Sequence, residues 1–212
     1  MTPAKDCMVG YGIPMMKQLA TFWLAALFAV SPLTAEQQKP LGEQLRVRWD
    51  GFNVIVIKDG VKHPFNVQKD MKAYAIENVR LLSAKASGDF IYLLLDITAA
   101  SRGGSEEAAQ RECGVAEEES LIWLKVNQEF KEINSKSFPI ESCWDGATPD
   151  HTDKPLTFDG SRLIVTGSTF RDPSKSELAQ MGEQVSYTYT VEYSLNHPDE
   201  GLQVKLVRDE PR

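Results

Sequence analysis

The sequence predicts an all-β protein, an antiparallel meander of about ten strands that forms a sandwich or a barrel-like domain. Short runs of alternating or β-branched residues, separated by tight-turn signals, extend from Leu45 to Glu210. Long stretches with the 3.6-residue period of a helix are missing from the same region. Because parallel strands need crossover connections of about a dozen residues or more, these short connections predict antiparallel sheets.

The strands are expected as a series of hairpins. Leu45–Val67 divides into three short strands at Asp50-Gly51 and at Lys58–Gly60, and an Asp-Gly pair between apolar runs is a strong hairpin signal. Four further hairpins follow, each with its own turn signal: Asn78–Thr98 turns at Ser87–Asp89, Ser120–Phe138 near Asn127–Glu129, Pro155–Phe170 at Asp159–Ser161, and Gln184–Glu210 within Asn196–Gly201. Only Lys69–Asn78 and Asp172–Gln184 offer room for short helices.

Apolar patterning predicts which strands are central. Phe90–Ile97 and Ser120–Asn127 are apolar on both sides of the strand alternation, so both should be covered on both faces. Tyr187–Tyr193 alternates cleanly, which predicts a buried face that carries the tyrosines and a solvated opposite face. Hairpins recur at intervals of about 30–40 residues, so a partial propeller-like array is the alternative architecture. The repeating units differ in sequence, which favours the sandwich or barrel.

The N-terminal residues have the pattern of a secretory signal peptide. Leu19–Val30 has no charge and no proline, and a stretch that ends at the small residue Ala35 follows it. Twelve helical residues span about 18 Å, against about 30 Å for a membrane core, which disfavours a membrane anchor. We expect residues 1–35 to be an extension plus signal peptide, with its core at about 15–35, and residues 36–212 to form a single periplasmic or secreted all-β domain. Three start sites fit this pattern: Met1, Met15 and Met16.

Charge and motifs narrow the functional classes. The chain has 23 basic and 30 acidic residues, a net charge of −7, which argues against nucleic acid as a partner and permits a basic protein or another envelope component. No stable membrane span is expected after signal cleavage. The sequence has no nucleophile elbow, zinc-protease motif or phosphate loop, so no catalytic residue and no cofactor is predicted. Carboxylates dispersed along the chain leave hydrolysis open.

Cys113 and Cys143 are predicted to form a disulfide, because two cysteines in an exported protein are most simply paired. They flank one predicted hairpin, whose outer ends are neighbours in space. A closed loop of about 30 residues stabilises the fold by about 3–4 kcal/mol in the chain-entropy model. A redox site of the Cys-x-x-Cys type or a four-ligand zinc site would need residues that this pair lacks.

Two polar segments contain the candidate site residues. The residues Asp145, Asp150, His151 and Asp153 are weak candidates for calcium ligands, and a polar connector is the favoured interpretation of their segment. The acidic stretch at residues 101–120 ends in the candidate binding residues Glu117, Glu118 and Glu119, which the disulfide would bring towards the fourth candidate, Trp144. An acidic loop beside an anchored aromatic residue suits a basic protein partner, whereas the bland alternative is a solvated loop.

These observations predict an exported, disulfide-containing β protein, and they favour a non-catalytic binding or interaction protein of the cell envelope. One alternative is a secreted hydrolase whose carboxylates are dispersed in sequence. The other is a purely structural envelope protein. Fold-level analogy alone does not separate these three functions, so the site must decide between them.

Overall fold

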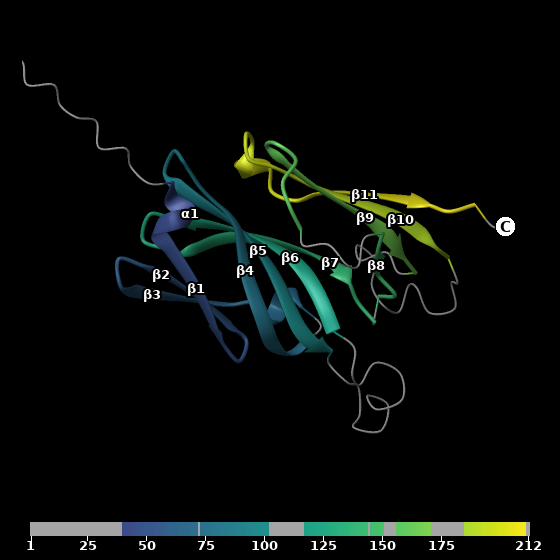
Figure 1. The fold of residues 1–212 in the computed structure, drawn as a ribbon, viewed down its shortest axis with the longest axis horizontal. Coiled ribbons are helices and arrows are strands. Elements are labelled where there is room, and N and C mark those ends of the chain that lie inside the picture. Colours follow the sequence, from purple (N-terminus) through teal and green to yellow (C-terminus); the bar gives the residue numbers. More distant parts are fainter. Residues whose placement is uncertain are drawn as a thin grey trace, which may run out of the picture. The chain divides into compact units, whose positions relative to one another are not determined.

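The computed structural model describes residues 40–71, 73–101, 117–143, 145–150, 156–170 and 185–210 (Figure 1). All of them belong to one compact unit, Gln38–Arg212. Eleven strands in this part of the chain pair antiparallel in three sheets, which confirms the predicted all-β class. No described sheet closes into a barrel, and no described helix is long and apolar enough to cross a membrane. The expected signal peptide lies outside the described residues.

The first sheet has the strand order β1-β2-β3 and follows a one-turn helix. Its elements are α1 (Leu41–Gln44), β1 (Leu45–Asp50), β2 (Asn53–Lys58) and β3 (Val61–Asn66). Two-residue turns join the strands, and Gly51, Asp59 and Gly60 in these turns have φ angles of 57°, 50° and 82°. The left-handed backbone at these positions is what the Asp-Gly signals predict, and all three expected strands are confirmed.

The second sheet has the order β4-β5-β6-β7. Its elements, with the short 3-10 helix before them, are η1 (Gln68–Asp70), β4 (Ala73–Ser87), β5 (Phe90–Ser101), β6 (Glu117–Asn127) and β7 (Glu132–Glu141). The helix considered for Lys69–Asn78 does not extend beyond Asp70, because β4 begins at Ala73. Register shifts at Ala73/Ala75 and Ile76/Asn78 interrupt the inward–outward alternation at the start of β4, so this part of the strand lacks the usual strand pattern. The rest of β4 confirms the strand predicted from Asn78 to the turn at Ser87–Asp89.

The third sheet has the order β11-β10-β9-β8. Its elements are β8 (Thr148–Pro149), β9 (Arg162–Thr169), β10 (Tyr187–Ser194), η3 (Pro198–Glu200) and β11 (Gln203–Arg208). The two-residue β8 pairs with the far end of β9, and β11 is the opposite edge of the sheet. The helix considered for Asp172–Gln184 lies outside the described residues.

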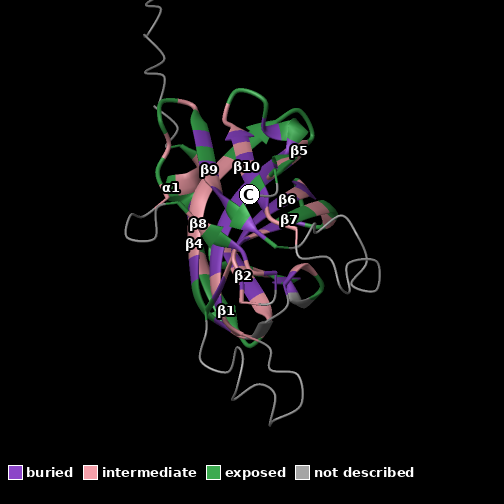
Figure 2. Ribbon diagram, turned by 90° about the vertical axis from the view of Figure 1, so that its right-hand side faces the viewer, coloured by how far each residue is buried: buried purple, intermediate pink, exposed green. Residues whose placement is uncertain are grey.

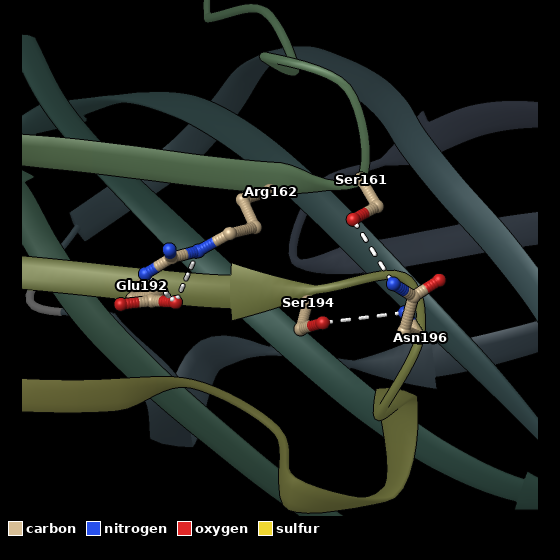
Figure 3. Close-up of polar contacts among 5 residues, drawn as sticks. All are labelled: Ser161, Arg162, Glu192, Ser194 and Asn196. Atoms are coloured by element: carbon tan, nitrogen blue, oxygen red, sulfur yellow. Dashed lines mark hydrogen bonds and ion pairs between the residues drawn. The ribbon is translucent and has the colours of Figure 1, made fainter.

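Polar contacts fix the register where β9 starts and β10 ends (Figure 3). Arg162 Nε donates to Glu192 Oε1 at 2.7 Å across the two strands. Asn196 donates its side-chain amide to Ser161 Oγ at 3.1 Å and its backbone N–H to Ser194 Oγ at 3.2 Å. Because these groups face solvent, they position the strands more than they stabilise them.

The second sheet lies between the other two, and we call it the central sheet. Leu93 and Leu95 of β5 belong to the core shared with β1–β3, whereas Tyr92 and Leu94 belong to the core shared with β9 and β10. This confirms that β5 is covered on both faces, and Figure 2 shows buried positions along the strands. The outer sheets cover opposite faces of the central sheet, so the fold is a layered sandwich and not a propeller-like array.

Candidate functional site

The three glutamates predicted to bind a partner are the first residues of β6. They lie opposite residues 98–100 of β5, and because side chains alternate along a strand they cannot share one face. Glu117 is exposed. Glu118 is buried on the face towards β1–β3, and Glu119 is half-buried on the face towards the third sheet. Glu117 is therefore the one member of this trio that is freely exposed to solvent.

Glu118 anchors the turn that follows β7. Its Oε1 accepts hydrogen bonds from Ser101 Oγ at 2.8 Å and from the backbone N–H of Cys143 at 3.2 Å. Burial raises the pKa of the Glu118 carboxyl, and hydrogen bonds from Ser142, Ser101 and Cys143 offset only part of this rise. The charge of Asp145 raises the pKa further. Glu118 thus joins the end of β5, the start of β6 and the turn after β7.

The turn after β7 is also joined to the end of β9. Ser142 and Ala147 close it with two backbone hydrogen bonds of 3.0 and 2.9 Å. The backbone carbonyl of Asp145 accepts a bond of 2.7 Å from Thr169 Oγ1 and one of 3.2 Å from the N–H of Phe170. The turn therefore follows β7 of the second sheet and is hydrogen-bonded through Asp145 to the end of β9 in the third sheet.

Phe170 lies on this turn and exposes most of its side chain. Gly146 has a φ angle of 59°, and a Cβ added there would lie 2.5 Å from Phe170 Cδ2, so glycine is required for conformation and for space. Phe170 is 64% exposed, the highest value among the large apolar residues in the described part of the chain. We call residues 142, 143 and 145–147, together with Phe170, the Phe170 turn.

The predicted disulfide is only partly within the described residues. Cys113 and Trp144 lie outside them, so the pairing and the predicted aromatic contact remain predictions. Cys143 follows two residues after Glu141, which pairs with Glu119 of β6. Cys143 therefore lies beside the start of β6. Cys113 comes shortly before this start in the sequence.

The four weak candidates for calcium ligands also lie partly inside and partly outside the described residues. His151 and Asp153 lie outside the described residues, whereas Asp145 is buried and Asp150 is exposed. The backbone N–H of Asp145 donates to Ser142 Oγ at 3.1 Å, which gives the residue a structural role in the turn. Within the described ranges, no group of three or more His, Cys, Asp or Glu residues could hold a metal ion.

A cluster of ionisable residues that the sequence did not predict lies between the central and third sheets. Asp96 of β5 is only 2% exposed, and its Oδ2 accepts hydrogen bonds from Nε of Arg80 at 2.8 Å and from Nη2 of the same guanidinium. Glu119 of β6 lies one diagonal step from Asp96 on the same face of the β5–β6 ladder. Glu141 of β7 pairs directly with Glu119. Three carboxyl groups therefore meet one guanidinium on this face of the central sheet.

The surroundings of Glu119 favour its neutral form. Burial raises the pKa of Glu119 to about 8, with further contributions from the charge of Asp96, the hydrogen bond to Asp96 and the charge of Glu141. Arg80 opposes the rise. The nearby Tyr189 of β10 also has a raised pKa, because it is buried and faces the charges of Asp150, Glu119 and Glu141.

Two features of the sequence point to this cluster of ionisable residues. Asp96 is the single charge inside the apolar run Phe90–Ile97, and a charged residue in a strand covered on both faces requires a partner. Arg80 occupies the equivalent place in Asn78–Leu82. That the two residues pair follows from the β4–β5 register, in which Arg80 lies opposite Asp96. Three bulges in β4 prevent that register from being counted along the sequence.

Comparison with known proteins gives no match to a family model, a curated protein or a solved structure. The fold defines this chain as an all-β protein whose central sheet is covered on both faces. The Phe170 turn and the buried carboxyl residues Asp96 and Glu119 are the two features of its described part that bear on function.

Proposed function

We propose that this chain is an exported, non-catalytic binding protein of the cell envelope, and that it docks a basic partner at the Phe170 turn. Export rests on the signal-like pattern at residues 15–35. Binding rests on one observation, the exposed ring of Phe170 on a turn that is hydrogen-bonded to two sheets. A rigid exposed aromatic residue is the kind of side chain that dominates the binding energy of protein interfaces.

A basic partner is favoured by the charge of the chain and of this region. The net charge is −7, and Glu117 and Asp150 are exposed near the Phe170 turn. Glu117 opens β6 beside Cys143, and the backbone N–H of Asp150 donates to the carbonyl of Thr166 in β9 at 2.9 Å. Acidic groups around an aromatic anchor accelerate the encounter with a basic surface and suppress acidic competitors.

The hydrolase alternative would have to use Asp96 and Glu119, the carboxyl pair with the most perturbed surroundings. A general acid and base must lie within hydrogen-bond reach of the bond that is cleaved. Asp96 is 2% exposed and is occupied by Arg80, so it is poorly placed to reach a substrate. A glycosidase pair must also admit a sugar between its two carboxyls, whereas Glu119 is half-buried on the same covered face of the central sheet as Asp96.

The test compares capture of envelope proteins by the wild type and by matched variants. Phe170→Ser removes the proposed anchor, and Ile133→Ser removes a similarly exposed residue, 52% against 64%, from β7. We expect Phe170→Ser to lower the affinity for the captured partner by about tenfold or more, and Ile133→Ser to leave it unchanged. Glu117→Gln should weaken capture less and reduce its dependence on salt.

Melting temperatures of all three variants should stay close to that of the wild type, because the side chains are exposed. An identified partner that binds Phe170→Ser and the wild type equally would exclude the Phe170 turn as the docking surface. Hydrolysis of a polysaccharide or peptide that Glu119→Gln abolishes would instead establish the hydrolase alternative.

A further inference from the structure

Asp96 has an unusual hydrogen-bond balance for a carboxylate that is almost fully buried. Its Oδ2 accepts from Arg80, but its Oδ1 is also buried and meets no donor in the described part of the chain. A buried acceptor without a donor costs about 1–3 kcal/mol, and more when it is charged. The folded state must compensate for this cost, and the carboxyl of Glu119, on the neighbouring strand and the same face, can do so when it is protonated.

Two ionised carboxylates cannot satisfy each other, because both are acceptors only. Glu119 and Asp96 nevertheless lie on the same face of neighbouring strands, one diagonal step apart in the β5–β6 ladder, so their side chains are within reach of each other. A hydrogen bond between them requires one of them to carry a proton. Arg80 donates to Asp96 and holds the negative charge on that residue, so the proton resides on Glu119. The protonated Glu119 is then the donor that Asp96 otherwise lacks.

We propose that Asp96 and Glu119 share one proton in the folded protein, and that loss of this proton weakens the packing of the third sheet on the central sheet. The proposal is independent of the proposed binding function. It identifies a pH-sensitive contact that is built into the fold.

The charged and titratable groups around Glu119 determine the consequence of deprotonation. They come from every strand packed against it: Arg80 from β4, Asp96 from β5, Glu141 from β7 and Tyr189 from β10. An ionised Glu119 faces two carboxylates and one guanidinium, and it loses its hydrogen bond to Asp96. Like charges in a partly buried site repel strongly because solvent screens them poorly.

The repulsion acts at the contact between two layers. Tyr189 of the third sheet donates its hydroxyl to the carbonyl of Ile140 at 2.6 Å, and Ile140 directly precedes Glu141. A new negative charge on Glu119 therefore appears beside the strand end to which the third sheet is bound. Separation of β10 from β7 admits water and relieves the repulsion.

The sign of the pH dependence follows from the raised pKa. Glu119 titrates near 4.5 in the unfolded chain and near 8 in the folded protein, so the folded state binds the proton more tightly. The stabilisation is fully present below about pH 4.5 and is lost as the pH rises towards 8. The test measures urea unfolding of the purified wild type, Glu119→Gln and Glu117→Gln between about pH 5 and pH 9.

Glutamine at position 119 stays neutral and still donates a hydrogen bond to Asp96. Relative to Glu119→Gln, the wild-type unfolding constant should rise by up to about tenfold per pH unit between about pH 5.5 and pH 7.5. Glu117→Gln removes an exposed carboxyl two residues away on the same strand, and it should follow the wild type. Parallel pH profiles for the wild type and Glu119→Gln would overturn the proposal.

An infrared measurement tests the shared proton without unfolding the protein. The band of a protonated carboxyl should persist in the folded wild type at about pH 7 and disappear with a midpoint near the pKa of Glu119, about 8. Asp96→Asn removes the repelling charge and should shift this midpoint to lower pH. A spectrum without such a band at about pH 7, or a band that Asp96→Asn and Glu119→Gln both leave unchanged, would contradict a proton shared by this pair.

Discussion

The hydroxyl of Tyr189 in β10 donates a hydrogen bond of 2.6 Å to the backbone carbonyl of Ile140 in β7. Ile140 is the extra residue of a β-bulge, because Glu119 of β6 pairs with Glu141 while the next residue of β6 pairs with Pro139. The carbonyl of Ile140 lies at this bulge, and the Tyr189 hydroxyl donates to it. A single bulge thus links the backbone of the central sheet to a side chain of the third sheet.

Tyr189→Phe tests this link. The ring remains packed 5.1 Å from the ring of Phe138, but the buried carbonyl of Ile140 loses its donor. We expect the free energy of unfolding to fall by about 1–3 kcal/mol, measured by urea denaturation. Tyr193→Phe is the control, since Tyr193 is equally buried in β10 and its hydroxyl makes no described bond to the backbone of the central sheet. An equal decrease in the free energy of unfolding of both variants would show that the hydrogen bond to Ile140 does not stabilise the fold.

Gly167 makes the position of Tyr189 possible. A Cβ at Gly167 would lie 2.4 Å from the Tyr189 hydroxyl and 2.4 Å from the carbonyl oxygen of Thr148 in β8. Gly167→Ala should therefore displace the tyrosine or detach β8, and overpacking of this kind destabilises a protein by about 1–3 kcal/mol. Gly42→Ala is the control, because a Cβ there meets no atom within 4 Å. Thermal melting of Gly167→Ala that matched Gly42→Ala would contradict this close packing.

The sequence predicts the layers of this fold well because burial leaves a local pattern. Phe90–Ile97 is apolar at odd and even positions, and the structure covers β5 on both faces. Tyr187–Tyr193 alternates, and its tyrosines are buried. The Asp-Gly turns are likewise local, since two residues determine their backbone angles.

Contacts that depend on strand register could not be predicted. The glutamates at 117–119 form one acidic run in sequence, but the pleat of β6 directs them to different faces and gives each a different environment. The approach of Asp96 to Glu119 requires the β5–β6 register. Fifteen residues, 102–116, separate these two strands in the sequence, so no tight-turn signal determines that register. A lone charge in an apolar strand indicates that a partner exists, but not which residue it is.

Trp123 of β6 makes a second hydrogen bond from the central sheet to the C-terminal part of the chain. Its Nε1–H donates to the carbonyl of Pro198 in η3 at 2.9 Å, and its ring is 2% exposed. Trp123→Phe removes this donor and leaves a small cavity, so we expect unfolding to require about 1–3 kcal/mol less free energy. Trp49→Phe, at a position that is 41% exposed, should change stability by less than about 0.5 kcal/mol. Similar effects of the two substitutions in urea denaturation would argue against a structural role for the Pro198 contact.

Glu118 should make the Phe170 turn dependent on pH in its own right. Its pKa is raised above the ordinary value of 4.5, first by burial, so the folded state holds the Glu118 proton more tightly than the unfolded state. The stabilisation is complete below about pH 4.5 and decreases as the pH rises through the folded-state pKa. Glu118→Gln keeps an oxygen acceptor for Ser101 and Cys143 and cannot ionise.

We therefore expect Glu118→Gln to lose less stability than the wild type as the pH rises above about 4.5, in thermal melts over a pH series. Glu118→Val removes the acceptor and leaves the backbone N–H of Cys143 without its bond to residue 118, so it should lower the melting temperature at every pH. Hydrogen exchange at Cys143 and Asp145 should accelerate in Glu118→Val and stay slow in Glu118→Gln, because the acceptor holds the turn and the charge does not. Equal exchange in the two variants would mean that Glu118 does not anchor the Phe170 turn.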